Sequence, residues 1–306
     1  MRRSAATTVL QFVALALAWG SSFVFVSIAL GTFTFWQTTW LRIVLAALTL
    51  GLVVLLTRSR LPREKGVYLH FLVIGAAANI VPNLGYAYGL TQVSAGVVAM
   101  YASTSGLAAA LLSALVFKIE RLTPLRVLPV VIGAAGVLVI IGPWAGVVAD
   151  SLTGQLASLA AAVSYAASLA YARRFVTDRD IPVLTMAFLN VAGSAVLLLP
   201  FTPVMLLPLP VEPRLVAVLA MVWVAAVPTG IAQLWNLNVL RRWGPVATST
   251  VTYLLPVVAS ALGLVLLGEA LTWNEMLGAG IIIAALAARQ FMGPAVPRSP
   301  AAMAPP

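Results

Sequence analysis

Long apolar runs separated by short polar segments are the dominant pattern along this chain, and the stretch from Val9 to Leu30 is an example. About 20 apolar residues cross a bilayer once as a helix. A transmembrane β-barrel instead needs short segments that alternate apolar and polar residues, and these runs do not alternate. We therefore predict an all-α integral membrane protein with ten transmembrane helices. The expected spans are residues 9–30, 35–57, 67–90, 93–117, 124–141, 152–174, 183–206, 214–240, 246–267 and 273–292.

Composition agrees with this pattern and narrows the function classes. Of the 306 residues, 62% are hydrophobic and 8% charged, and the mean hydropathy is +1.05, so ten spans leave no room for a sizeable soluble domain. The proline-rich residues 293–306 are typical of a disordered tail. There is no cysteine, which excludes disulfides, thiolate nucleophiles and cysteine metal sites.

The positions of the basic residues predict the orientation in the membrane. Sixteen of the 18 Lys and Arg residues fall in segments that alternate spans would place on one side. They are Arg2, Arg3, Arg58, Arg60, Arg63, Lys65, Lys118, Arg121, Arg126, Arg173, Arg174, Arg179, Arg241, Arg242, Arg289 and Arg298. The positive-inside rule then places both termini in the cytoplasm of a multi-pass protein of the cell (inner) membrane. This bias also explains the net charge of +10 without a nucleic-acid partner.

An internal repeat divides the chain into halves of five spans, residues 1–142 and 152–292. The segment Glu120–Thr123 resembles Glu269–Thr272 at a spacing of 149, and Pro82 and Pro228, 146 residues apart, occupy spans three and eight. Because five is odd, the second half enters the membrane in the opposite sense. We expect two inverted repeats, the arrangement that alternating-access transporters use.

Three motifs resemble those of the drug/metabolite transporter superfamily, in particular its EamA-type ten-helix members. They are the sequences WGSSF at 19–23, SAGVVA at 94–99, and LPV at 255–257 followed by LGEALT at 267–272. The resemblance covers nearly the whole chain. It implies an exporter of metabolites or amino acids with a central cavity lined by spans one, three, four, six, eight and nine.

Uncharged polar and aromatic residues are the candidate lining of that cavity. Pro82 and Pro228 each interrupt a helix, and paired broken helices in corresponding positions of two repeats indicate a midplane binding site with two hinges. The candidates for substrate binding are Trp19, Ser22, Asn79, Asn83, Tyr86, Tyr101, Ser105, Tyr165, Ser168, Gln233, Trp235, Asn236, Thr252 and Tyr253. The alternative for each hydroxyl or amide is packing between helices.

Ionisable groups are scarce within the predicted spans. All eight carboxylates fall in loops or at helix ends, so no acidic proton relay is visible and facilitated transport is the leading mechanism. Arg42 lies inside span two. It is a candidate anchor for a substrate carboxylate; the alternative is that it extends to the outer interface beside Trp36 and Trp40.

The sequence thus predicts a transporter that exports small metabolites through a central cavity by alternating access. Amino acids, perhaps aromatic or otherwise apolar, are the first choice of substrate. The alternatives are proton-coupled efflux of toxic organic compounds, and a membrane-embedded enzyme or lipid-handling protein. No motif indicates a catalytic group, cofactor or metal. The expected partners are a small-molecule substrate and membrane lipid, and a monomer can enclose the cavity alone.

Overall fold

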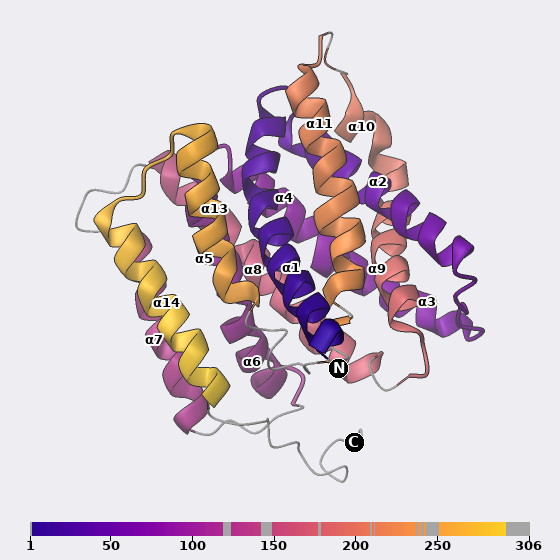
Figure 1. Cartoon of the computed structure of the whole chain (residues 1–306), viewed down its shortest axis with the longest axis horizontal. Helices are drawn as coiled ribbons and strands as arrows, with labels where there is room; N and C mark the ends of the chain where they lie inside the picture. Colours follow the sequence, from indigo (N-terminus) through magenta and orange to yellow (C-terminus); the bar gives the residue numbers. More distant parts are fainter. Residues whose placement is uncertain are drawn as a thin grey trace.

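The structure, a computed structural model, describes residues 2–118, 124–141, 149–176, 179–208, 210, 212–236, 238–239, 242 and 251–291. All regular secondary structure in these ranges is helical, and ten helical passes form one bundle (Figure 1). Seven passes are long and apolar enough to cross a membrane, and three shorter apolar helices complete the ten. The predicted fold class is therefore confirmed. The segment 120–123 and the predicted tail 293–306 lie outside the described residues.

The first five passes contain seven α-helices and one π-helical segment. They are α1 (Arg2–Leu30), α2 (Phe35–Leu56), α3 (Lys65–Gly75) with η1 (Ala76–Ile80) and α4 (Val81–Gly89), α5 (Ala95–Ser103) with α6 (Ser105–Leu115), and α7 (Pro124–Ile141). The last five are α8 (Ala149–Phe175), α9 (Val183–Leu198) with η3 (Leu199–Phe201) and α10 (Thr202–Leu206), α11 (Leu215–Val224) with η4 (Ala225–Ile231), α13 (Val251–Leu267) and α14 (Trp273–Phe291).

Both proline-containing passes change to π-helix at the predicted positions. Pro82 begins α4 directly after η1, and Pro228 lies inside η4. Proline has no N–H to donate and its ring clashes with the preceding turn, so a regular α-helix cannot continue through it. The Ser164 hydroxyl donates to the Ala77 carbonyl (2.9 Å), and the Thr229 hydroxyl donates to the Val224 carbonyl (2.9 Å). Side chains thus satisfy backbone groups in both interruptions.

The start of α2 is fixed by a reciprocal cap. The Thr34 hydroxyl accepts the Gln37 N–H (3.2 Å), and the Gln37 side-chain oxygen accepts the Thr34 N–H (2.9 Å). The Gln37 amide nitrogen also donates to the carbonyls of Leu206 and Pro208. These bonds tie α2 to the segment after α10 and set the rotation of its first two turns.

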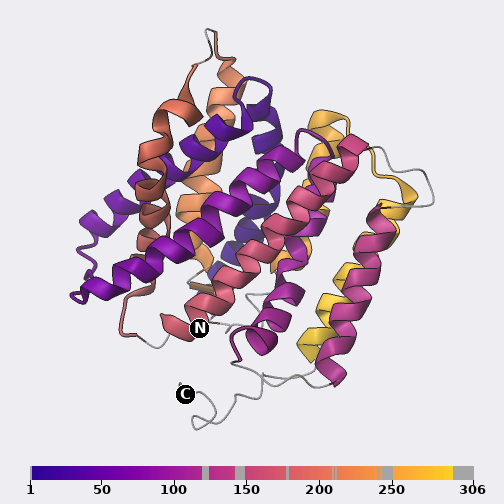
Figure 2. The same ribbon diagram turned by 180° about the vertical axis from the view of Figure 1, so that it is seen from behind.

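The two repeats pack against each other through corresponding helices. Helix α13 lies beside α5, and α14 lies beside α7 at one edge of the molecule in both views (Figures 1 and 2). The Ser103 hydroxyl of α5 donates to the Thr252 carbonyl of α13 (3.0 Å), and these residues are 149 positions apart. That is the spacing of the sequence echo, so equivalent residues meet where the repeats join. Helix α1 begins and α14 ends at the same end of the bundle.

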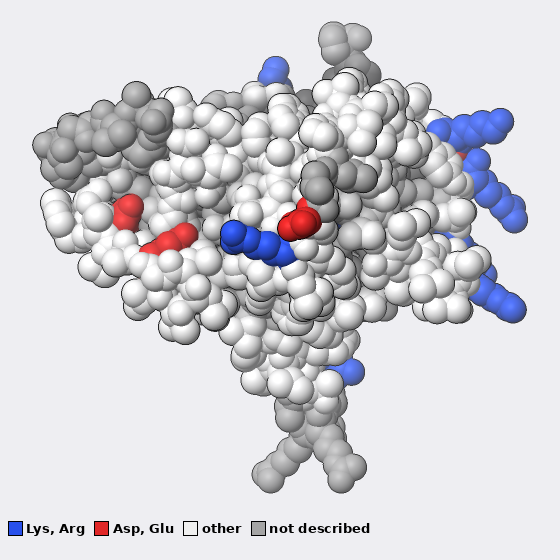
Figure 3. Space-filling model, turned by 90° about the horizontal axis from the view of Figure 1, so that it is seen from above, with Lys and Arg blue, Asp and Glu red and all other residues white. Residues whose placement is uncertain are grey.

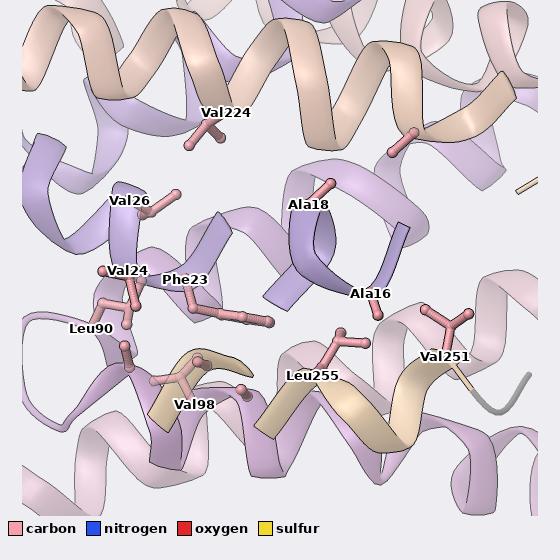
Figure 4. Close-up of a cluster of buried hydrophobic side chains, with 14 of the residues drawn as sticks. Ala16, Ala18, Phe23, Val24, Val26, Leu90, Val98, Val224, Val251 and Leu255 are labelled. Carbon is pink, nitrogen blue, oxygen red and sulfur yellow. The ribbon is translucent and has the colours of Figure 1, made fainter. Parts of the chain in front are cut away.

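The largest core cluster joins α1, α5, α11 and α13. Figure 4 shows Val24 and Phe23 of α1 lying near Leu90 and Val98, with Leu255 of α13 further along. The outer surface is apolar as well, since Leu55 and Val204 are 73% and 80% exposed. Seen from above, most of the surface is uncharged and the Lys and Arg side chains project mainly at one edge (Figure 3). Such a surface suits contact with lipid.

Candidate functional site

A cleft in the first repeat brings together the strongest group of polar side chains. It is lined by Phe23 and Val26 of α1, by Thr38, Thr39 and Arg42 of α2, and by Asn83, Tyr86, Ala87 and Leu90 of α4 and its end. We call it the Arg42 cleft. The volume open to the centres of water molecules is about 10 Å³, which is room for about one water. In this conformation the cleft is therefore nearly closed.

Arg42 points toward the broken eighth pass. Its Nε donates to the Thr229 hydroxyl of η4 at 3.2 Å, and Tyr86 is close enough to interact electrostatically with the guanidinium. Within the described residues no carboxylate lies at ion-pair distance, and neither terminal nitrogen donates a hydrogen bond. The side chain thus lies in the cleft rather than at the interface, and the planar end of its charged group is unused.

Two threonines beside Arg42 carry unsatisfied hydroxyls. Thr38 and Thr39 are each 1% exposed, and neither hydroxyl has a hydrogen-bond partner. Threonine in a helix usually bonds a carbonyl one turn back, as Thr49 of the same helix does with Leu45 (2.8 Å). Residues three and four positions apart share a helix face, so both threonines lie on the face of Arg42. Their hydroxyls face the cleft instead of their own backbone.

The opposite wall is formed by α4. No hydrogen bond joins the Asn83 amide or the Tyr86 hydroxyl to another residue in the described ranges. The Tyr86 ring packs edge-on against Phe23, with ring centroids 5.9 Å apart. Tyr165 of α8 lies close enough to Tyr86 to influence it electrostatically. The cleft therefore combines hydrogen-bonding groups with an aromatic and aliphatic wall.

Trp19 connects the first pass to the second hinge. Its indole Nε1 donates to the Pro228 carbonyl at 3.0 Å. The Ser22 hydroxyl donates to the Trp19 carbonyl one turn back (2.7 Å), so it serves its own helix. Trp19 and Arg42 thus both bond η4, one through the backbone and one through Thr229.

Three predicted lining residues bond neighbouring helices instead. The Asn79 amide donates to the Asn190 side chain (2.9 Å) and to the Ser194 hydroxyl (3.0 Å) of α9. Tyr101 is fully buried and donates to Gln155 of α8 (2.6 Å). Tyr253 donates to a carbonyl of α14 (2.8 Å).

The remaining candidates lie elsewhere in the bundle. Ser105 is buried at the start of α6, and the Ser168 hydroxyl bonds the Tyr165 carbonyl. Trp235 is partly buried against the main core cluster, and the Thr252 carbonyl accepts the Ser103 bond. Gln233 and Asn236 are partly buried on the pass that follows η4. None of these residues lines the Arg42 cleft.

Sequence reasoning did not select Thr38, Thr39, Thr229 or Phe23. A signal was present for the threonines, because they precede Arg42 by four and three positions on one helix face. Thr229 gave no comparable signal, since its contact with Arg42 spans 187 positions. Only the packing of α2 against η4 reveals that contact.

A carboxylate outside the spans joins the two repeats at another place. Gly268 adopts a left-handed backbone (φ 69°) after α13, and Glu269 then accepts the Ala95 N–H at the start of α5 (2.8 Å). Partial burial raises the pKa of Glu269, and the bond from Ala95 opposes that rise. The described residues contain no cluster of three or more His, Cys, Asp or Glu that could hold a metal.

Comparison with known proteins decides the family. The model of the EamA-like transporter family matches residues 6–142 and 152–288, once for each repeat. The chain belongs to the EamA-like transporter family. A solved crystal structure whose title states only that it is of a protein shares 21% identity, with a TM-score of 0.63, over 94% of this chain and 98% of that one. No curated protein matches significantly.

Membership establishes a membrane transporter of the drug/metabolite type, built from two EamA repeats. The structural match supports the fold alone, because its sequence identity is low. The identity of the substrate therefore depends on the chemistry of the cleft.

Proposed function

We propose that this EamA transporter exports small, partly apolar metabolites, with amino acids as the first choice, by alternating access around the Arg42 cleft. The observation that carries this proposal is the combination of unbonded polar groups and an apolar wall in one cleft. Arg42, Asn83 and Tyr86 have hydrogen-bonding capacity that no described residue uses. Ligand sites typically combine an apolar lining with a few polar groups of this kind.

An amino acid matches these groups. Its carboxylate can meet Arg42, its amino group can meet the oxygens of Asn83 and Tyr86, and an apolar side chain can contact Phe23. Cationic drugs match less well, because no carboxylate lines the cleft and Arg42 repels a cation. A zwitterion or an acid is thus the better ligand.

The π-helical segments supply the conformational change. Both η1 and η4 contain backbone groups held by single side-chain bonds rather than by a regular helical ladder. Such segments are easier to deform than continuous helices. Because Arg42 and Trp19 bond η4 directly, a substrate that displaces the Arg42 contact changes the forces on this hinge.

The absence of a proton-carrying group from the cleft supports facilitated transport. None of the described residues that line it is Asp, Glu or His. Proton coupling commonly uses such a residue within the membrane. We expect the concentration gradient of the substrate to drive export.

We also propose that both termini face the cytoplasm of the inner membrane. The basic bias of the loops supports this, as does the common end at which α1 begins and α14 ends. Because the chain has no cysteine, single cysteines report topology directly. In intact cells an impermeant maleimide should label Arg214→Cys but not Arg60→Cys. The reverse pattern would invert the topology.

The proposed function is tested by transport in sealed proteoliposomes. Labelled leucine, phenylalanine and a quaternary ammonium ion are loaded, and efflux is followed with and without a proton ionophore. We expect efflux of an amino acid that the ionophore leaves unchanged. Efflux that depends on a proton gradient rejects facilitated transport, and efflux of the quaternary cation alone favours drug export. Chemical conversion without movement of solute favours the enzyme alternative.

A further inference from the structure

The Arg42 cleft holds four kinds of hydrogen-bonding group without partners. Besides the terminal nitrogens of Arg42, they are the hydroxyls of Thr38 and Thr39, the amide of Asn83 and the hydroxyl of Tyr86. Buried polar groups are normally bonded, and each exception needs an explanation. Elsewhere in the bundle comparable groups are satisfied, as Asn79 and Ser194 are between α3, η1 and α9. The concentration of exceptions in one cleft points to a ligand that completes their bonds.

The geometry of the donors selects the chemistry of that ligand. The unused end of a guanidinium presents parallel N–H donors that match the two oxygens of a carboxylate. A threonine hydroxyl donates equally well to a carboxylate oxygen. Thr38, Thr39 and Arg42 share one face of α2, so three residues can converge on one anionic group.

The charge of the cleft leads to the same conclusion. A buried guanidinium without a counter-ion is costly, and no carboxylate of the described residues lies within ion-pair distance of Arg42. A bound carboxylate neutralises this charge. A bound amine or quaternary ammonium adds a second positive charge in surroundings of low dielectric constant.

We propose that Arg42, Thr38 and Thr39 form a carboxylate seat, and that solutes recognised by this transporter carry a carboxylate next to a small apolar group. This inference rests on the proposed function and specifies its substrate class. Phe23, Val26 and Leu90 provide the apolar contact, and they lie near one another at one end of the cluster in Figure 4. The cleft is too small for a whole amino acid, so the carboxylate enters as α2 and η4 separate and Arg42 leaves Thr229.

Four compounds with one aliphatic group test the seat on the wild-type protein in lipid nanodiscs. Leucine carries both charged groups, 4-methylpentanoate only the carboxylate, and leucinamide and 3-methylbutylamine only the amine. Binding is measured by tryptophan fluorescence and by calorimetry. We expect the two carboxylates to bind at least about tenfold more tightly than the two amines, because a hydrogen bond to a charged group contributes about that factor or more.

Variants locate the seat. Arg42→Gln should weaken both carboxylates by about ten- to hundredfold and leave the amines unchanged. Arg42→Lys, which keeps the charge but loses the planar donors, should give an intermediate loss. Thr38→Val and Thr39→Val should each weaken carboxylate binding several-fold. The matched control is Thr49→Val on the same helix, because its hydroxyl is already bonded to Leu45, and it should leave binding unchanged.

The outcomes separate this inference from the proposed function. Equal binding of leucine and leucinamide, failure of all four compounds to bind, or an Arg42→Gln protein that keeps the carboxylate preference overturns the seat. Export of an amino acid in proteoliposomes would still stand in those cases. Conversely, tight carboxylate binding without any efflux supports the seat and rejects export. The compound series needs no variant, so poor folding of Arg42→Gln leaves the test intact.

Discussion

Two regions of the first repeat place similar polar residues in opposite situations. One is the α3–α9 seam, defined as Gly75 and Asn79 with Asn190 and Ser194 of α9. There the Asn79 amide bonds both α9 side chains, and the Ser194 hydroxyl donates to the Gly75 carbonyl at 3.1 Å. The other is the Arg42 cleft, where Asn83, only four residues after Asn79, bonds no described residue.

This difference shows how a helix break decides what an amide does. Four residues of regular α-helix would keep two side chains on one face, but η1 contains Asn79 and widens the turn before α4 begins. Asn79 therefore faces α9, while Asn83 faces α2 and the cleft. The seam stabilises the fold with satisfied groups, whereas the cleft keeps unsatisfied groups available for binding.

The largest expected effect tests how closely the seam packs. A Cβ at Gly75 would lie 2.7 Å from the Ser194 backbone nitrogen and 2.9 Å from the Asn190 carbonyl. Gly75→Ala should therefore lower the free energy of unfolding by about 1–3 kcal/mol, because backbone must move to admit the methyl group. The measurement is unfolding in detergent followed by tryptophan fluorescence.

The control is Gly280→Ala on α14, where a Cβ would meet nothing within 4 Å. It should leave stability unchanged or slightly raised, because alanine favours helix. Equal stability of the two variants would remove close packing as the reason for glycine at position 75.

A medium effect separates the two asparagines. Asn79→Ala leaves its α9 partners without a donor and should cost about 1 kcal/mol of stability, while the relative affinities for carboxylates and amines stay as in the wild type. Asn83→Ala breaks no protein hydrogen bond and should instead reduce transport several-fold at unchanged stability. Efflux and unfolding are measured on both proteins. Loss of transport with Asn79→Ala alone would reverse our assignment of the two regions.

The smallest effect concerns Thr38. Its buried hydroxyl has no partner, so Thr38→Val should raise the free energy of unfolding by about 0.5 kcal/mol, since the methyl group incurs no polar desolvation. The matched Thr49→Val removes a formed bond and should lower stability instead. Unfolding of the two variants beside the wild type measures both signs. Equal destabilisation would mean that Thr38 is bonded in the membrane.

The amino-acid sequence by itself determined the ten spans, the two repeats and both helix breaks. These depend on properties that act locally: apolar length sets a crossing, and Pro82 and Pro228 cannot continue an α-helix wherever they are packed. Glu269 was visible in the repeat, but its cap on α5 was not, because Ala95 is 174 positions away.

Which polar groups stay unsatisfied was decided only by the tertiary structure. The sequence left Arg42 between the interface and the cavity, and it grouped Asn79 with Asn83. Contacts between distant segments resolved both, since Thr229 of η4 holds Arg42 inward and α9 takes the bonds of Asn79. A hydroxyl or amide has the same hydrogen-bonding capacity in every sequence position. Whether a neighbouring helix uses that capacity or leaves it for a ligand depends on the rotation and packing of helices far apart in the chain.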